Sequence, residues 1–376
     1  MSGIHSYITD YVSKDYGGVE VKPDALNCSL GVNDLPLPKE ISEALGQLPP
    51  EILKQYPHDE QIDRVIYEGL CARFAPAVSL KPENILFGDG SFDLLSNLNL
   101  LYAGCGRRIL CHAPQFTAYI DHCHCIGAEV HTYRLEVGER FTYKFHMEEF
   151  ISKASRVQPH LICCENPINP TGKAIPLAEL RALLHAAKRE GAALVVDEAY
   201  GDYLPVEASA ACLLPEAEAI GAELYVTRSF SKGFGLAGIR MGYVIGSAYG
   251  LSQLGKLVTP FNCNALARYV VKELFTRCPD YPENLIAGTQ AANAKLYAAI
   301  AAMGDKYLLA DTTPSTPLCT LSVPDPDVDL CRALAKAGLA AVSCATYENM
   351  GKNSVRLMLS RNLDRLIDLL AKAEPG

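Results

Sequence analysis

The sequence predicts an α/β protein in which a large domain with a mostly parallel central sheet precedes a smaller α+β domain. Its 376 residues exceed the size at which one hydrophobic core usually stops growing, which favours two domains. Short apolar runs alternate with helical patterns over the first 260 residues, and this alternation is typical of a parallel sheet covered by helices. Beyond Pro260 the pattern changes to alanine-rich helices and a few short strands, which indicates a second architecture.

The strands of the large domain are predicted where apolar and β-branched residues form short uninterrupted runs. These runs are 109–111, 129–133, 161–164, 192–196, 224–227 and 243–245. A helix is predicted over 176–190, because its leucines recur on one face. Gly191 follows directly and is suited to end that helix, since glycine accepts the left-handed conformation common at helix ends.

The smaller domain is predicted from the pattern of the last third of the chain. Its expected elements are helices over 265–276 and 285–303, strands over 318–323 and 354–359, and a last helix over 361–372. The predicted division is an N-terminal arm, 1–38, that joins the small domain, then a large domain, 39–258, and a small C-terminal domain, 259–376.

Composition and charge exclude several classes of protein. A formal net charge of −9 and a pI near 5.5 argue against binding to nucleic acid or to anionic membranes. No apolar run reaches the roughly 20 residues that cross a bilayer, and the N-terminus lacks the pattern of a signal peptide. The fourteen cysteines lie in apolar stretches, so we expect reduced thiols and a cytoplasmic protein.

One short segment, His122-Cys123-His124-Cys125, raises the question of a metal site. Zinc ligands normally come as spaced pairs, whereas four consecutive residues point in different directions on a helix and alternate between faces on a strand. We therefore expect a Cys- and His-rich buried segment here and no metal.

Four segments follow predicted strands, at the edge where open α/β sheets place their functional sites. They are GDGSFD (88–93), NPINPTG (166–172), DEAY (197–200) and SFSKGFGLAGIRMGY (229–243). Each alone has an ordinary interpretation as a turn, a helix cap or a solvated loop. The four together, in this order, indicate one site.

In this order the segments resemble those of the class I and II aminotransferases, especially the histidinol-phosphate-aminotransferase-like branch. The resemblance extends from about Asn27 to Arg361, and the block around Lys232 is its most specific part. It implies the pyridoxal-phosphate-dependent transferase fold type I, with the cofactor pyridoxal 5'-phosphate bound in the large domain. Lys232 would carry the cofactor as a Schiff base and act as the catalytic base.

The resemblance also implies roles for the other residues of these segments. Asp197 would pair with the protonated pyridine nitrogen, while Asn169 and Tyr200 would hydrogen-bond the phenolic oxygen of the ring. Phe116 would stack on the ring face. The phosphate would be held by a glycine-rich turn, two hydroxyl groups and one guanidinium: Gly90, Ser91, Phe92, Ser229, Ser231 and Arg240.

Three further residues are implied at the substrate side and at a subunit interface. Arg356 resembles the arginine that clamps the substrate carboxylate, and Asn33 is a second candidate for substrate binding. Tyr56 resembles the tyrosine that reaches the phosphate of the partner subunit's cofactor in a homodimer. The chain departs from the branch at 341–344, where a second arginine for the substrate phosphate is missing, and at Phe92, which replaces an acidic residue.

The expected activity is transfer of an amino group between an L-amino acid and a 2-oxo acid, both small molecules. The departures disfavour histidinol phosphate as the substrate. An alternative is a lyase of the same fold, such as a threonine-phosphate decarboxylase, which segment 344–351 resembles, or a cyclase or oxidase of an arginine derivative. A non-catalytic protein that binds the cofactor is a third possibility, which the presence of Lys232 disfavours.

Overall fold

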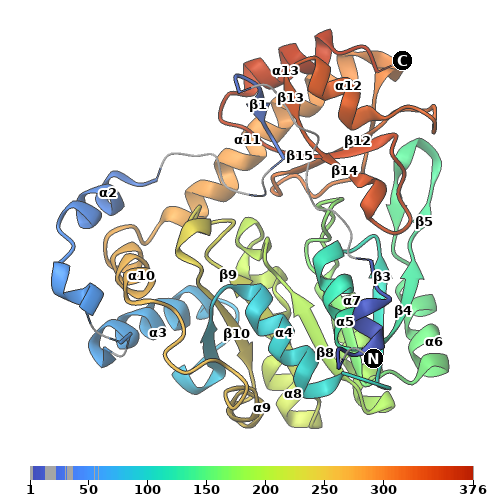
Figure 1. The fold of residues 1–376 in the computed structure, drawn as a ribbon. Coiled ribbons are helices and arrows are strands. Elements are labelled where there is room, and N and C mark those ends of the chain that lie inside the picture. The colour runs from blue at the N-terminus through green and yellow to red at the C-terminus, as the bar shows by residue number, and fades with distance from the viewer. Residues whose placement is uncertain are drawn as a thin grey trace.

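The chain folds into a large domain, at the bottom of Figure 1, and a smaller domain above it. The computed structural model describes residues 3–12, 23–29, 31, 37–54, 56–57 and 59–375. None of the described helices combines the length and the hydropathy that a bilayer-spanning segment needs.

The large domain is built on a seven-stranded sheet. In spatial order its strands are β2 (Ile85–Gly88), β10 (Gly242–Gly246), β9 (Leu224–Ser229), β8 (Ala193–Asp197), β7 (Leu161–Glu165), β3 (Arg108–Ala113) and β4 (Glu129–Arg134). Only β10 runs antiparallel to its neighbours in this sheet. The mostly parallel sheet expected from the sequence is confirmed, and β7, β8 and β9 end at the same edge.

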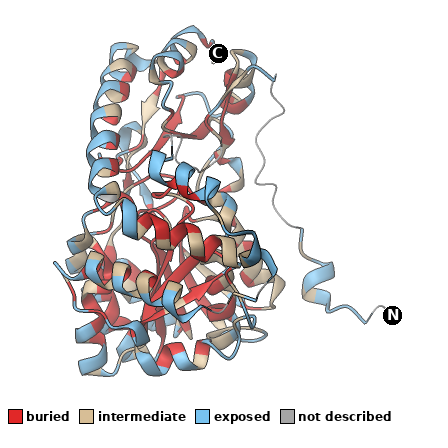
Figure 2. Ribbon diagram, turned by 90° about the vertical axis from the view of Figure 1, so that its left-hand side faces the viewer, coloured by how far each residue is buried: buried red, intermediate tan, exposed pale blue. Residues whose placement is uncertain are grey.

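Helices cover both faces of this sheet, which explains why its strands are apolar on both sides. On β7, Ile162 and Cys164 enter one core while Leu161 and Cys163 enter the other. The first core is completed by α3 (Glu60–Phe74), α6 (Met147–Val157), α7 (Leu177–Glu190) and α8 (Leu214–Ile220). The second is completed by α4 (Ser91–Tyr102), α5 (Thr117–Cys125) and α9 (Ala248–Leu254). Figure 2 shows this interior in red, with exposed residues on the outer helix faces.

The helix predicted over 176–190 is present as α7, and its end follows the expected chemistry. Gly191 adopts the left-handed conformation, with φ of 70°, and its N–H donates to the carbonyl groups of Ala187 and Lys188. These bonds satisfy carbonyls that the end of a helix otherwise leaves unpaired.

The small domain has a four-stranded sheet in the order β11 (Leu308–Leu309), β12 (Leu318–Ser322), β15 (Ser354–Met358) and β14 (Val342–Ser343). It is covered by α11 (Tyr281–Ala302), α12 (Leu330–Lys336) and α13 (Leu363–Lys372). From the N-terminal segment, β1 (Leu26–Asn27) pairs with β13 (Leu339–Ala340) of this domain. In contrast, the described segment 3–12 touches the large domain, since Tyr11 stacks on His124 of α5.

One helix belongs to a different domain from the one expected. We placed α10 (Ala265–Arg277) in the small domain, but it packs on α2 (Lys39–Gly46) and α3 of the large domain (Figure 1). Its buried Val270, Val271 and Leu274 lie in the first core of the large domain. Alanine-rich periodicity predicts that a helix forms but does not indicate which core will bury its face. The large domain therefore continues through α10.

Candidate active site

A cavity of about 370 Å³ lies at the carboxyl ends of β7, β8 and β9, between the large and small domains. Residues from both domains line it, together with Ser29 and Gly31 of the N-terminal segment. Most of the sequence-predicted site residues meet there: Ser91, Phe92, Phe116, Asn169, Asp197, Tyr200, Ser229, Ser231, Lys232, Arg240 and Arg356.

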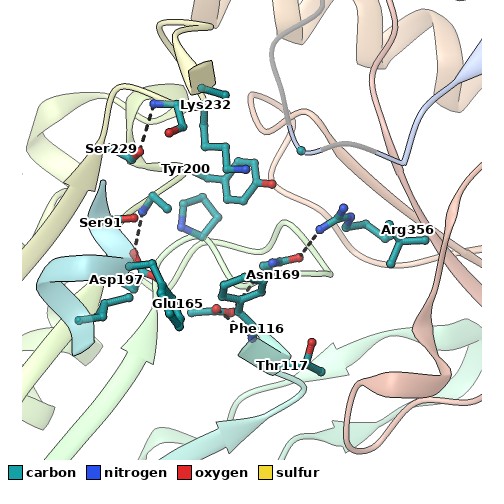
Figure 3. Close-up of a pocket in the computed structure, with 18 of the residues that line it drawn as sticks. Ser91, Phe116, Thr117, Glu165, Asn169, Asp197, Tyr200, Ser229, Lys232 and Arg356 are labelled. Carbon is teal, nitrogen blue, oxygen red and sulfur yellow. Dashed lines mark hydrogen bonds between the residues drawn. The ribbon is translucent and has the colours of Figure 1, made fainter. Parts of the chain in front are cut away.

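Lys232 follows β9 and extends its amine into this cavity (Figure 3). Its Nζ lies 5.4 Å from the centre of the Tyr200 ring. Gly31 closes over both groups, because a Cβ at this position would lie 2.5 Å from the Tyr200 hydroxyl and 2.8 Å from Lys232 Nζ. Only glycine fits at that position without displacing the amine.

A buried charge network supports the loops that carry Tyr200 and Lys232. Arg228, at the end of β9, pairs with Glu198 at 2.6 Å and with Asp202 at 3.2 Å, and all three are almost fully buried. Arg73 of α3 adds a second guanidinium to Asp202 at 3.0 Å. Sequence reasoning missed this network, for which the local signals were Glu198 directly after β8 and an arginine, Arg228, within the apolar strand β9.

Asp197 ends β8 with one carboxylate oxygen bound and the other facing the cavity. Its Oδ1 accepts hydrogen bonds from the Thr227 hydroxyl and the Ala199 N–H, both at 3.0 Å. Burial raises the pKa of Asp197 to about 6. Among the described residues no lysine or arginine forms an ion pair with it, so its charge is left for a cation inside the cavity.

Arg356 of β15 approaches the cavity from the small domain (Figure 3). Its Nη2 donates to the Ser29 carbonyl at 2.7 Å, and its Nη1 donates to Asn169 Oδ1 at 3.2 Å. The side chain is buried, its Nε has no hydrogen-bond partner, and no carboxylate among the described residues forms an ion pair with it. A buried guanidinium with only neutral partners is costly, and this cost favours binding of an anion.

An anion site forms where α4 begins. Gly90 has φ of 95°, and a Cβ there would lie 2.6 Å from the guanidinium of Arg240. Arg240 Nη1 also donates to the Ser231 hydroxyl at 3.4 Å, while the Ser229 hydroxyl accepts from the Ser231 N–H at 3.1 Å. A helix N-terminus, two hydroxyls and an arginine together suit a phosphate group.

Asn169 and Phe116 line the cavity on the side of β7. Asn169 Oδ1 accepts from Arg356 and from the Tyr347 hydroxyl, the latter at 3.3 Å. This arrangement leaves the amide NH₂ of Asn169 for a ligand. Tyr347 is buried in the loop after the 3₁₀ turn Cys344–Thr346 and lines the cavity. The sequence analysis did not assign Tyr347 a role, and its nearest signal was the unusual segment 344–351.

Among the described residues, two sequence-predicted ones do not line this cavity: Gly90, which lies beside it at Arg240, and Tyr56. Tyr56 is 76% exposed and stacks on Phe261 with 4.7 Å between ring centres. The remaining candidate, Asn33, lies outside the described residues. In the Cys- and His-rich segment, Cys123 is buried beside Asn99. Among the residues that the structure describes, no group of three His, Cys, Asp or Glu side chains is arranged to hold a metal ion.

These groups match what pyridoxal phosphate requires of a protein. An amine is available for its aldehyde, an unpaired buried carboxylate for its pyridine nitrogen, and an anion site for its phosphate. The fold and the site thus define a pyridoxal-phosphate enzyme.

Comparison with known proteins identifies the family. Residues 26–370 match the aminotransferase class I and II family, and the chain belongs to it. A histidinol-phosphate aminotransferase from Carboxydothermus hydrogenoformans is 31% identical over 234 residues, which are 62% of this chain and 63% of that relative. The match therefore spans less than two thirds of the relative. The resemblance inferred from the four segments and the pyridoxal-phosphate cofactor are confirmed.

Solved structures share the fold at low identity. N-succinyldiaminopimelate aminotransferase from Mycobacterium tuberculosis superposes with a TM-score of 0.78 at 19% identity, covering 92% of this chain and 93% of that one. Histidinol-phosphate aminotransferase from Sinorhizobium meliloti, in complex with pyridoxal 5'-phosphate, gives 0.74 at 18% identity, with 93% and 89% covered. These likenesses confirm the type I fold.

Proposed function

We propose that this chain transfers an amino group between an L-amino acid and a 2-oxo acid, with Lys232 as the catalytic residue. The observation that carries the proposal is a pair of buried charges, Asp197 and Arg356, on different sides of the cavity that holds Lys232 (Figure 3). Neither has an ion-pair partner among the described residues. A cationic ring nitrogen and a substrate carboxylate would supply the missing charges.

Bound pyridoxal phosphate supplies an aldehyde that condenses with amines and a protonated ring that takes up electron density. Asp197 would hold the proton at the ring nitrogen through its free oxygen. The Asn169 amide and the Tyr200 hydroxyl would donate to the ring oxygen. Arg356 would hold the substrate carboxylate so that the Cα–H bond faces Lys232, whose amine would then move that proton.

A single-turnover experiment tests this function against its alternatives. With a good amino donor, the yellow holoenzyme should lose its absorbance and yield pyridoxamine phosphate and a 2-oxo acid, and a second 2-oxo acid should restore the colour. Release of carbon dioxide or ammonia without pyridoxamine phosphate would instead support the lyase alternative.

Among amino donors, the enzyme should also prefer amino acids with uncharged side chains over histidinol phosphate. Besides Lys232, Arg240 and Arg356, no lysine or arginine among the described residues lines the cavity. The small-domain side of the cavity presents Val342 and Tyr347, which offer no charge to a distal phosphate. Comparing kcat/KM for leucine, phenylalanine and histidinol phosphate checks this, and a clear preference for histidinol phosphate would contradict it.

Asp197→Asn should slow transamination while stabilising the cofactor-free protein. The variant removes the negative charge that keeps the ring nitrogen protonated, so we expect at least about a tenfold lower kcat, or ~1.4 kcal/mol. The folded pKa of about 6 lies above the ordinary 3.8, so folding favours the protonated acid and stability falls as pH rises between these values. Above pH 6 the variant should gain up to about 3 kcal/mol in unfolding free energy.

Kinetics and thermal unfolding at pH 5 and pH 8 measure the two effects of Asp197→Asn. The exposed Asp311, which pairs with Lys173, provides the matched control Asp311→Asn. Normal turnover of Asp197→Asn, or a cofactor-free variant less stable than the parent at pH 8, would contradict the role.

We further propose a homodimer in which Tyr56 reaches the phosphate bound by the partner subunit. Tyr56, Leu53 and Phe261 are 76%, 68% and 57% exposed, and an interface would cover these apolar side chains. Tyr56→Phe should weaken cofactor binding about tenfold, as expected for one lost hydrogen bond to a charged group. Tyr249→Phe, also at an exposed tyrosine, should not. A monomer in sedimentation that holds the cofactor tightly would contradict the dimer.

A cytoplasmic location is proposed on the state of the cysteines. All fourteen are free and nine of them are buried, so no disulfide forms in the structure. The proposed amino-group transfer makes amino acids and 2-oxo acids the expected small-molecule partners.

A further inference from the structure

Glu165, the last residue of β7, is a buried carboxyl group of the cavity that has no part in the mechanism above. It is 3% exposed and lies in register with Asp197 of the neighbouring β8. Desolvation, reinforced by the charge of Asp197, raises the pKa of Glu165 well above its usual range. A second acid beside Asp197 is therefore costly to bury, which calls for an explanation.

The hydrogen bonds of Glu165 connect two loops on the large-domain side of the cavity. Its Oε1 accepts from the Phe116 N–H and its Oε2 from the Asn169 N–H, both at 2.9 Å. Phe116 is the N-cap residue of α5, whereas Asn169 belongs to the loop after β7. The side chains of both residues line the cavity, and Figure 3 shows Glu165 close to them.

A buried histidine, His112 of β3, forms further hydrogen bonds that fix the same two loops. The Glu165 N–H donates to His112 Nε2 at 3.1 Å, and His112 Nδ1 lies 2.8 Å from the Pro114 carbonyl. Burial lowers the pKa of His112 to about 4, so the ring is neutral and its Nδ1 carries the proton that Pro114 accepts. The loop from Pro114 to Phe116 is thus tied to the end of β7 through both Glu165 and His112.

We infer that Glu165 is a positioning residue that sets Phe116 against the face, and Asn169 at the edge, of the cofactor ring. The inference rests on the roles proposed for those two residues. Only a carboxyl group of this length offers one acceptor oxygen to each N–H. Glutamine would turn its NH₂ toward one of the two donors, and aspartate is one methylene too short to reach both.

Holoenzyme carrying Glu165→Gln tests the inference with two readouts besides activity. We expect about tenfold weaker cofactor binding, the ratio that one buried unpaired donor gives. We also expect the pH midpoint of the yellow absorbance to rise, because a displaced Asn169 donates less well to the ring oxygen. Glu165→Asp, a milder change, should shift both readouts in the same direction and serves if the glutamine variant does not fold.

The matched control is Glu273→Gln, at a buried glutamate of α10 that pairs with Lys272 and Arg277 away from the cavity. It should lower the melting temperature without moving the cofactor affinity or the pH midpoint. Unchanged readouts in folded Glu165→Gln would overturn the inference.

A double variant separates positioning from a general loss of structure. If Glu165 acts on the midpoint through Asn169, adding Glu165→Gln to Asn169→Ala should move the midpoint no further, whereas additive shifts would refute the inference. Failure of the proposed function is distinguishable, because the parent enzyme would then yield no pyridoxamine phosphate in the single-turnover experiment.

Discussion

Lys232→Ala is expected to lower the transamination rate at least about a thousandfold, since it removes both the amine that binds the cofactor and the base that moves the proton. In the parent enzyme, borohydride reduction followed by peptide mapping should find the pyridoxyl group on Lys232. The amine points into the cavity beside Tyr200, under a glycine that leaves room for it.

Lys173→Ala is the matched control for this variant. Lys173 lies just beyond the Asn169 loop but is partly exposed and pairs with Asp311. Its replacement should leave both the rate and the borohydride label unchanged. A label on any lysine other than Lys232 would refute the assignment.

Arg356→Ala is expected to weaken the use of amino-acid substrates by roughly 2–4 kcal/mol, as for one member of a buried charge pair. This corresponds to about 30- to 900-fold in kcat/KM. The effect should be confined to substrates, because Arg356 contacts Ser29, Asn169 and Tyr347 and makes no contact with the anion site at Arg240.

Steady-state kinetics with a series of amino donors, together with cofactor titration, measures this effect. Arg356→Lys keeps the charge but loses the planar fork that grips a carboxylate at two points, so it should recover only part of the loss. An Arg356→Ala enzyme with parental kcat/KM would contradict the carboxylate clamp. If it instead released carbon dioxide, the arginine would be selecting which bond breaks.

The sequence alone determined six of the seven strands of the large-domain sheet, all except β2, and where its chemistry lies. Strands such as β7 and β8 are apolar on both faces because helices cover both, and this leaves short, recognisable runs. Polar residues directly after such runs, among them Asp197 and Asn169, must gather at one edge, because parallel strands end together. Local order along the chain was therefore sufficient to propose most of the cavity lining.

Tertiary structure decided the features that depend on contacts between distant segments. The periodicity of α10 was visible, but only packing assigned it to the large domain. Glu165 appeared as one more residue at the end of a strand, and its bond to Phe116, 49 residues earlier, has no signature in local sequence. Tyr347 and Arg228 likewise acquire their neighbours only on folding. Periodicity reports what one segment buries, whereas the partner it is buried against is set by the whole chain.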